Sequence, residues 1–432
     1  MSEPILKVSD YTIEFWVDGV WYPAAVNMNF EVQPGQVLAI VGESGSGKST
    51  TAMGLMSLLA SNARTSGSVS VKGVEMVGAS AATLRKFRGK EVAYIFQEPM
   101  TALNPVYTIG FQIVETLRNH FDMGPKQARE RAIELITMVE IPSPESSFDK
   151  YPHQLSGGQR QRAMIAQALA CDPGLLVADE PTTALDVTVQ AEILDLMRNL
   201  RDRLNSAVLL ITHDMGVVAD LADEILVMKD GNTVEHGTAD QIFNRPQHPY
   251  TQQLLASVPK LGSVAVRERV LEAGASQAPV LRLEDVSIEY PKRGRIPAFK
   301  AVQNFNLEIY PGEIVGLVGE SGSGKSQTAF SILGLLPGNA KIATGHIVFD
   351  GNELVSTGQG AISQKAMTQF RGKRIAYIPQ EPMSNLDPAF TIGYQLVRPM
   401  TQVLGISKKE AKARALKLLD MVGINNPERV FK

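Results

Sequence analysis

One eight-residue sequence occurs twice in this chain and constrains its fold more than any other feature. Gly42–Ser49 reads G-E-S-G-S-G-K-S, and the same eight letters return at Gly319–Ser326, an offset of 319 − 42 = 277 residues. The glycines allow the backbone to turn its N–H groups inward around a phosphate chain, the lysine pairs with the terminal phosphates, and the serine hydroxyl suits Mg²⁺. Each copy therefore predicts a binding site for a nucleoside triphosphate.

The residues around the first copy fit a strand, a loop and a helix. Residues 37–41 are an apolar run typical of a buried strand, and apolar periodicity predicts a helix over 48–60 whose N-terminus favours an anion. The predicted nucleotide contacts are Gly42, Glu43, Ser44, Gly45, Ser46, Gly47, Lys48, Ser49 and Thr50 in the first copy, and Gly319, Glu320, Ser321, Gly322, Ser323, Gly324, Lys325, Ser326 and Gln327 in the second. We also predict Ser49 and Ser326 as Mg²⁺ ligands.

Length and composition exclude several classes of protein. At 432 residues the chain is long enough for two or more domains, and its net charge of −3 gives no basic field for nucleic acid or anionic lipid. The single cysteine, Cys171, excludes a disulfide framework and multi-cysteine zinc or iron–sulfur sites, which fits a reducing cytosol. The sequence has neither a signal pattern at its start nor an apolar run of about eighteen residues that could span a membrane. At a membrane, another subunit would have to hold it.

The duplication extends beyond the two phosphate loops. Arg88–Gln97 matches Arg371–Gln380, and Glu-Pro-Met follows in both copies. Alternating strands and helices predict an α/β core, and helical periodicity between residues 97 and 155 predicts a helical subdomain inserted in it. We predict two P-loop α/β ATPase domains, the first at 5–243 and the second, incomplete, at 280–432, with an extension and linker at 244–279 between them.

Two acids and a glutamine follow predicted strands of the first domain. Residues 175–180 form an apolar strand that ends in Asp179 and Glu180, and Gln97 ends another strand. Asp179 suits Mg²⁺ through water, and Glu180 is placed to orient and deprotonate an attacking water. The amide of Gln97 can touch both the Mg²⁺ and that water, and Gln380 takes this place in the second copy. The plain alternatives are acids that cap a strand and a solvated glutamine.

Three further elements complete the set in the first domain. Leu155–Gln159 opens a helix as a second anion-binding end, for which a simple N-cap is the alternative. Asp186 turns the chain before an amphipathic helix at 187–204, and is alternatively the N-cap of that helix. His213 ends an apolar strand. A single histidine in this place is usually structural, but its occurrence together with the other motifs predicts that it senses the γ-phosphate. The predicted contacts from the second anion-binding end are Ser156, Gly157, Gly158 and Gln159.

Aromatic residues near the start of each copy are candidates to stack on an adenine ring. Phe15 and Tyr290 occupy corresponding strand positions in the two copies. Ordinary core packing is the alternative for both, and Trp16 or Tyr22 can substitute in the first domain.

The order of these motifs resembles an ABC-type ATPase domain. The motifs are the phosphate loop, Gln97, Leu155–Gln159, Asp179–Glu180, Asp186 and His213, and the resemblance covers all of the first copy and the first half of the second. It implies hydrolysis of ATP with Mg²⁺ by domains that act as head-to-tail pairs. In such a pair, each ATP lies between the phosphate loop of one domain and the Leu-Ser-Gly-Gly-Gln signature of the other.

A narrower resemblance concerns the type of ABC protein. Gln97–Pro105 with its twin Gln380–Pro388, and His248–Thr251 after the core, are similar to the oligopeptide, dipeptide and nickel importer ATPases, and the double domain resembles the glutathione and microcin-type peptide importers. This implies two integral-membrane permeases, a periplasmic solute-binding protein, and a peripheral place on the cytoplasmic face of the inner membrane, with residues 98–120 as the permease contact. Some members carry an iron–sulfur cluster, but Cys171 stands alone, so we expect none.

The alternative function is that of a soluble duplicated ABC ATPase acting on ribosomes. Such a protein needs RNA contact, usually through a long charged arm, whereas the linker at 260–279 is short and holds few basic residues. A DNA-repair ABC ATPase would need a coiled coil or a zinc insertion, and neither heptads nor clustered cysteines are present. We therefore expect an importer with no nucleic-acid partner. A peptide, a nickel chelate and glutathione all stay open as the solute.

The second copy stops before its own signature. The local offset is 380 − 97 = 283 residues, so the counterpart of Leu155 would fall at 155 + 283 = 438, past Lys432. Pairing the two copies within one chain then leaves both ATP sites incomplete. We expect hydrolysis to need two chains that associate through their first domains, and a longer natural chain would restore both sites.

Overall fold

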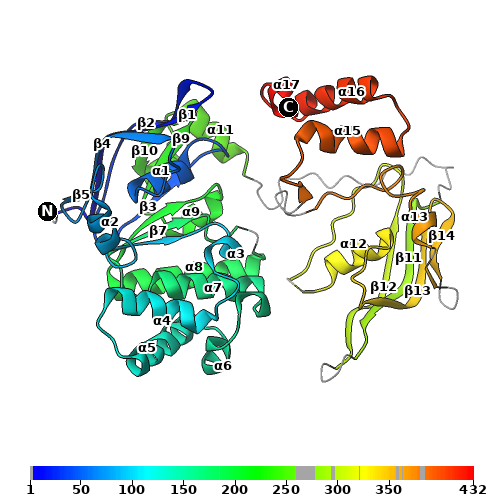
Figure 1. Ribbon diagram of the computed structural model, residues 1–432, viewed down its shortest axis with the longest axis horizontal. Helices are drawn as coiled ribbons and strands as arrows, with labels where there is room; N and C mark the ends of the chain where they lie inside the picture. The colour runs from blue at the N-terminus through cyan, green and yellow to red at the C-terminus, as the bar shows by residue number, and fades with distance from the viewer. Residues whose placement is uncertain are drawn as a thin grey trace. The chain divides into compact units, whose positions relative to one another are not determined.

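The computed structural model describes residues 3–183, 185–258, 278–292, 297–320, 322–356, 360–361, 363–379 and 385–432 (Figure 1). The chain divides into two compact units, Met1–Arg267 and Glu268–Lys432. Each unit has its own sheet and its own hydrophobic clusters. Ser321, Gln380 and most of the predicted linker lie outside the described residues.

The described part of unit 1 contains one sheet with the strand order β5-β4-β1-β2-β10-β9-β3-β8-β7-β6. In its centre β3 is parallel to β8 and β9, and β7 is parallel to β6 and β8. At the other end β1 is antiparallel to β2 and β4. The strands are β1 (Leu6–Val17), β2 (Val20–Val32), β3 (Val37–Val41), β4 (Ala63–Val71), β5 (Val74–Glu75), β6 (Val92–Ile95), β7 (Leu175–Asp179), β8 (Ala207–Ile211), β9 (Glu224–Lys229) and β10 (Asn232–Thr238).

β3 illustrates why the parallel strands are continuous apolar runs. All five of its residues are buried, with Val37 and Val41 in one hydrophobic cluster and Leu38 and Ile40 in another, so the strand has a core on both faces. The strand predicted at 37–41 is confirmed. Because β6, β7 and β8 run parallel to β3, their carboxyl ends meet at the edge of the sheet where the phosphate loop begins.

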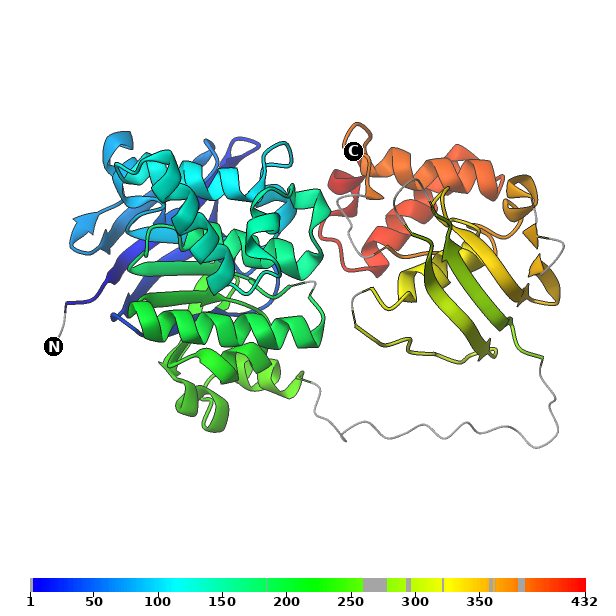
Figure 2. The ribbon, with the colours of Figure 1, turned by 90° about the horizontal axis from the view of Figure 1, so that it is seen from below.

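Helices cover both faces of the parallel strands. α4, α5 and α7 to α9 contribute to the cluster that contains Val37, whereas α1 contributes to the cluster that contains Leu38. α4, α5 and α6 pack against one another at the bottom of unit 1 in Figure 1, whereas α3 packs against α7, and all four lie in the helical insertion predicted between residues 97 and 155; Figure 2 shows the same chain from below. The helices up to the end of the core are α1 (Lys48–Leu55), α2 (Ala81–Phe87), α3 (Pro99–Ala102), α4 (Ile109–His120), α5 (Pro125–Met138), α6 (Pro144–Phe148), the 3₁₀ helix η1 (Pro152–Gln154), α7 (Gly157–Ala168), α8 (Val187–Leu204) and α9 (Met215–Leu221).

The helix that follows the phosphate loop is shorter than predicted. α1 ends at Leu55 instead of residue 60, because Ser57 adopts a left-handed backbone with φ of 52°. Arg88 satisfies carbonyl groups just after the end of α1, because its guanidinium donates to the carbonyl oxygens of Met56 at 2.9 Å and Ser57 at 2.8 Å. A cationic partner at a helix C-terminus is favourable for the helix dipole.

The segment after the core folds into two helices. α10 (Ala239–Asn244) begins at Thr238, whose hydroxyl accepts from the N–H of Gln241. α11 (Pro249–Ala256) begins at His248, which caps the helix, with Pro249 in the first turn where its missing N–H costs nothing. The His-Pro-Tyr-Thr sequence noted above is therefore the start of a helix.

The described strands of unit 2 form an antiparallel sheet in the order β12-β11-β13-β14-β15. Residues 314–318, the counterpart of β3, pair with none of these described strands, and Ile314 and Val318 are 96% and 89% exposed. In unit 1 the same run is buried because β8 and β9 flank it. The elements of unit 2 are β11 (Leu281–Tyr290), β12 (Phe299–Ile309), α12 (Lys325–Leu333), β13 (Lys341–Phe349), β14 (Asn352–Ser356), β15 (Gly360–Ala361), α13 (Gln364–Met367), α15 (Ile392–Val403), α16 (Lys408–Met421) and α17 (Pro427–Phe431).

Candidate nucleotide site

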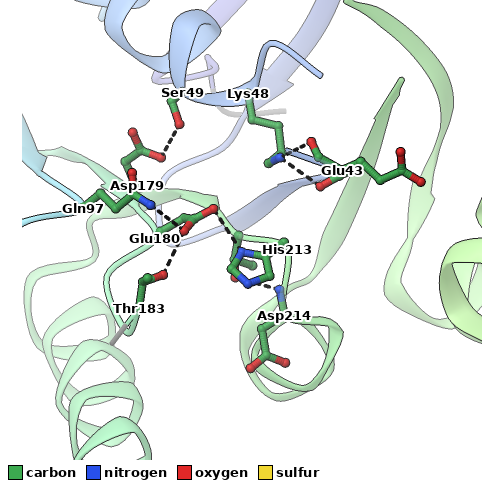
Figure 3. Close-up of polar contacts among 11 residues, drawn as sticks. Glu43, Lys48, Ser49, Gln97, Asp179, Glu180, Thr183, His213 and Asp214 are labelled. Carbon is green, nitrogen blue, oxygen red and sulfur yellow. Dashed lines mark hydrogen bonds and ion pairs between the residues drawn. The ribbon is translucent and has the colours of Figure 1, made fainter. Parts of the chain in front are cut away.

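The first phosphate loop is shaped by glycines and by one lysine. Gly42 and Gly47 have φ of 151° and 96°, and a Cβ on Gly47 would lie 2.1 Å from the carbonyl oxygen of Ala24 in β2. Only glycine fits that position. The Nζ of Lys48 donates to the carbonyl oxygens of Gly42 and Glu43, both at 2.8 Å, and holds the loop closed around its own ammonium group (Figure 3).

The second loop repeats this geometry. Gly319 and Gly324 have φ of 155° and 94°, and the Nζ of Lys325 donates to the carbonyl oxygens of Gly319 and Glu320, both at 2.7 Å. Lys48 is buried, whereas Lys325 is half-buried and Ser326 is exposed. The two loops therefore share a backbone shape but differ in how deeply the surrounding chain covers them.

Ser49 and Asp179 meet beside the first loop. The Ser49 hydroxyl donates to Oδ1 of Asp179 at 2.9 Å, and the hydroxyl of Tyr94 donates to Oδ2 at 2.8 Å (Figure 3 for Ser49). Asp179 is 4% exposed. Burial raises the pKa of its carboxyl group, and the two hydrogen bonds oppose that rise. Both carboxylate oxygens are thus oriented by hydroxyl donors.

Glu180 gathers the other predicted side chains. Its Oε1 is 3.0 Å from Nδ1 of His213, and its Oε2 accepts from Nε2 of Gln97 and from the hydroxyl of Thr183, both at 2.8 Å (Figure 3). The N–H of Glu180 donates to the carbonyl oxygen of Ile211 in β8, which fixes its backbone at the sheet edge. Three side chains from three different segments therefore position one carboxylate.

Electrostatics keep Glu180 ionised. Burial alone would raise the pKa of its carboxyl group, but the hydrogen bonds from His213 and Thr183 more than offset burial and hold the pKa below its ordinary value. For Lys48, burial lowers the pKa of the ammonium group against the opposing charges of Glu180 and Asp179. The two acids and the lysine therefore influence one another electrostatically.

Sequence reasoning missed two members of this cluster. Tyr94 lies in β6 three residues before Gln97, and Thr183 lies three residues after Glu180. The repeat carried a signal for the first, because Tyr377 occupies the same place before Gln380. No pattern marked Thr183, whose role depends on the turn that follows β7.

The signature residues and Asp186 act as helix caps in unit 1. The Ser156 hydroxyl accepts from the N–H of Gln159 at 3.3 Å, and the Gln159 side chain accepts from the N–H of Ser156 at 3.2 Å. Asp186 accepts from the N–H of Val189 and caps α8. A Cβ on Gly158 would lie 2.7 Å from Cγ1 of Val189, so α7 and α8 approach closely there. The N-cap alternatives noted from the sequence are thus realised. Ser156 and Gly157 remain exposed.

The candidate adenine platforms differ in exposure. Phe15 packs against the cluster that contains Leu38, whereas Trp16 and Tyr22 are each about half exposed. Tyr290 of β11 is half-buried. Trp16 and Tyr22 are therefore more exposed than Phe15, and the ring of Trp16 also contacts that of Trp21 at a centroid distance of 5.2 Å.

Comparison with known proteins identifies the family. Residues 25–183 and 302–432, well over half of the chain, match the family model described as ABC transporter. The chain belongs to the ABC transporter ATPase family. Residues 234–280 of this ABC ATPase match a second family, described as the oligopeptide/dipeptide transporter C-terminal region. The family resemblance and the α/β fold class predicted above are confirmed.

The ABC ATPase has curated relatives of the same kind. The glutathione import ATP-binding proteins GsiA of Shigella sonnei (strain Ss046) and Escherichia coli (strain K12) are each 41% identical over 462 residues, which cover 99% of this chain and 72% of the relative. Among solved structures, the dimeric post-hydrolysis state of an ATP-binding cassette bound to ADP and Pi matches with a TM-score of 0.50 and 29% identity. That match covers 54% of this chain and 98% of the cassette.

Proposed function

We propose that this ABC ATPase hydrolyses ATP at its first phosphate loop to drive import of a peptide or of a peptide-like solute such as glutathione. The observation that carries the proposal is the convergence of Gln97, Thr183 and His213 on Glu180, beside the Ser49–Asp179 pair. Relatives named as glutathione import ATP-binding proteins support the direction and the solute class. They also favour an importer over the ribosomal alternative.

The residues of the first loop fit a phosphate chain. The hydroxyl of Ser46 is buried and has no hydrogen-bond partner among the described residues. Because buried hydroxyl groups are normally hydrogen-bonded, this one is available to bind a phosphate oxygen. Lys48 presents a buried ammonium group in a loop where a Cβ on Gly42 or Gly47 would clash with a backbone carbonyl oxygen. These features support the loop, Gly42–Thr50, as the site that binds the triphosphate. The second loop, Gly319–Gln327, is proposed for the same role because its described backbone is alike.

The pair of Ser49 and Asp179 fits Mg²⁺. One hydroxyl and one carboxylate, 2.9 Å apart, are the small set of protein oxygens that Mg²⁺ uses when phosphates and waters supply the other ligands. Gln97 offers an amide oxygen nearby, since its nitrogen is already bonded to Glu180. When bound, the ion would neutralise phosphate charge. Ser326 and Gln380 are the corresponding proposals in the second copy, although Gln380 lies outside the described residues.

Glu180 is proposed as the general base. Its ionised carboxylate can take a proton from the water that attacks the terminal phosphate, while Gln97 orients that water. His213 holds Oε1 of Glu180 and is proposed to contact the terminal phosphate with its exposed ring. Lys48 would stabilise the charge that develops on the phosphate oxygens.

The signature of unit 1 is proposed to serve another ABC domain. Ser156 and Gly157 are exposed at the start of α7, where their hydroxyl and N–H groups can reach a phosphate presented from outside. The solved neighbour is a dimer bound to ADP and Pi, which supports the pairing of two such domains. We therefore propose self-association through the first domain, with Asp186 at the same junction.

An apolar surface on α3 and α4 is proposed as the contact with the permeases. The surface-forming side chains lie at or near these two helices and are each 39–69% exposed, and the rings of Tyr107 and Phe111 stack at 4.7 Å. No described helix of the chain is both long and apolar enough to cross a membrane. We propose that the permeases attach the chain to the inner membrane and that a periplasmic protein supplies the solute. The residues of this surface are Phe96, Met100, Val106, Tyr107 and Phe111.

The permease contact can be tested with matched substitutions. Val106→Glu places a charge in the apolar surface, whereas Val20→Glu places the same charge on an exposed valine at the start of β2. With the cognate permeases coexpressed, Val106→Glu should abolish sedimentation with membranes and solute-stimulated ATPase, while Val20→Glu should leave both intact. Equal behaviour of the two variants would contradict the assignment of the surface. Copurification with ribosomes instead of permeases would contradict the importer function.

A further inference from the structure

The first phosphate loop is anchored by a residue from the segment that follows the core. The N–H of Glu43 donates to the hydroxyl of Tyr250 in α11 at 3.0 Å, across a sequence separation of 207 residues. Tyr250 is 5% exposed. A main-chain N–H in a partly buried site is costly to leave without an acceptor, so this bond contributes to the shape of the loop.

Tyr250 is itself held firmly. Its ring joins the hydrophobic cluster under α4 to α9, and the ammonium of Lys229 lies 4.8 Å from the ring centroid. Its N–H donates to Nδ1 of His248 at 3.2 Å. The carboxylate of Glu235 in β10 accepts from the N–H groups of Gln247 at 2.7 Å and His248 at 3.1 Å, which fixes the approach to α11.

Glu43 is therefore gripped from two sides. Its N–H bonds to Tyr250, and its carbonyl oxygen accepts from Lys48. The Lys48 bond belongs to a group that is expected to turn to phosphate oxygens, so it is not a permanent anchor. The acceptor of the Glu43 N–H is a side chain of α11, outside the loop, so this bond does not have to break when Lys48 turns to a phosphate.

We propose that Tyr250 is a positioning residue for the first phosphate loop, and that the segment after the core tunes ATP affinity through this hydroxyl. The inference rests on the proposed role of Gly42–Ser49 as the phosphate site. A loop that samples other shapes binds its ligand more weakly in proportion to the fraction of time it is misshapen. Loss of one hydrogen bond should lower that competent fraction and weaken MgATP binding about 2- to 10-fold.

The test uses the full chain with Lys325→Ala in every sample, so that binding reports on the first loop. Tyr250→Phe removes only the hydroxyl. Tyr11→Phe is the matched control, because Tyr11 is fully buried and its hydroxyl has no partner among the described residues. Lys48→Ala is the reference for loss of the site. MgATP affinity, the thermal midpoint and amide hydrogen exchange of the peptide containing residues 42–49 are measured for each.

We expect Tyr250→Phe to weaken MgATP binding about 2- to 10-fold and to speed amide hydrogen exchange in the loop peptide. Amide hydrogens in the rest of unit 1 should exchange as slowly as they do in Tyr11→Phe. If Tyr250→Phe changes neither the MgATP affinity nor the exchange of the loop peptide, the inference about Tyr250 is wrong. The proposed phosphate site still holds in that case, provided that Lys48→Ala weakens MgATP binding. Faster exchange throughout unit 1 would also overturn it, since Tyr250 would then be only a core residue. Tight binding by Lys48→Ala would instead refute the proposed site itself.

Discussion

Replacement of Glu180 by glutamine removes the proposed general base but keeps most of the hydrogen bonds that position this side chain. In Glu180→Gln the amide oxygen can still accept from Gln97 and Thr183, and the amide nitrogen can donate to an unprotonated Nδ1 of His213. Shape and most hydrogen bonds survive, so we expect the free energy of unfolding to change by no more than about 1 kcal/mol. What is lost is the ionised oxygen that accepts the proton of the attacking water.

The expected loss of turnover follows from that one function. General base catalysis contributes about 10²- to 10⁴-fold, which corresponds to about 3–5.5 kcal/mol of activation free energy. ATP affinity should stay within about twofold, because Glu180 contacts no residue of the phosphate loop through the hydrogen bonds described. The variant should therefore bind ATP and retain it.

The assay compares single-turnover ATP hydrolysis and equilibrium ATP binding in Glu180→Gln and Glu130→Gln, both with Lys325→Ala. Glu130→Gln is the control because it makes the same chemical change on an exposed carboxylate of α5, outside the phosphate loop. We expect the control to hydrolyse ATP at the rate of the parent. Hydrolysis by Glu180→Gln within tenfold of the parent would refute the assignment of the base.

Two further predictions concern the supports of the site. Tyr94→Phe removes the hydroxyl that donates to Oδ2 of Asp179, so the Mg²⁺ concentration for half-maximal ATPase activity should rise about 10-fold. If Tyr94→Phe and the control Tyr11→Phe need the same Mg²⁺ concentration, Tyr94 does not orient Asp179 for the ion. Burial would raise the pKa of Glu235, but the bonds from the Gln247 and His248 N–H groups hold that pKa below its ordinary value. The stabilisation of α11 by this carboxylate should therefore be full above the ordinary pKa of a glutamate, about 4.3, and should fade as the pH falls below it. Exchange protection of α11 in Glu235→Gln should lack that dependence.

Local patterns predicted much of the fold of unit 1. The buried strand at 37–41 and the helix at 187–204 both appear with the expected bounds, because a continuous apolar run and a 3.6-residue period are properties of the segment alone. The end of α1 could not be predicted in this way. It depends on the left-handed conformation of Ser57 and on Arg88, which lies 31 residues further along the chain.

The residues proposed for chemistry divide along the same line. Gly42–Ser49, Gln97, Asp179, Glu180 and His213 could be named from the sequence because phosphate and water chemistry restricts which side chains stand at each motif. Tertiary structure alone decided that Tyr94 and Thr183 hold the two acids and that Tyr250 anchors the loop. The repeat marks the position of Tyr94 through Tyr377, but it does not show which group the hydroxyl contacts, and no pattern marks Thr183. The group that each hydroxyl contacts is decided only when the chain folds and the parallel strands bring distant segments to one edge of the sheet.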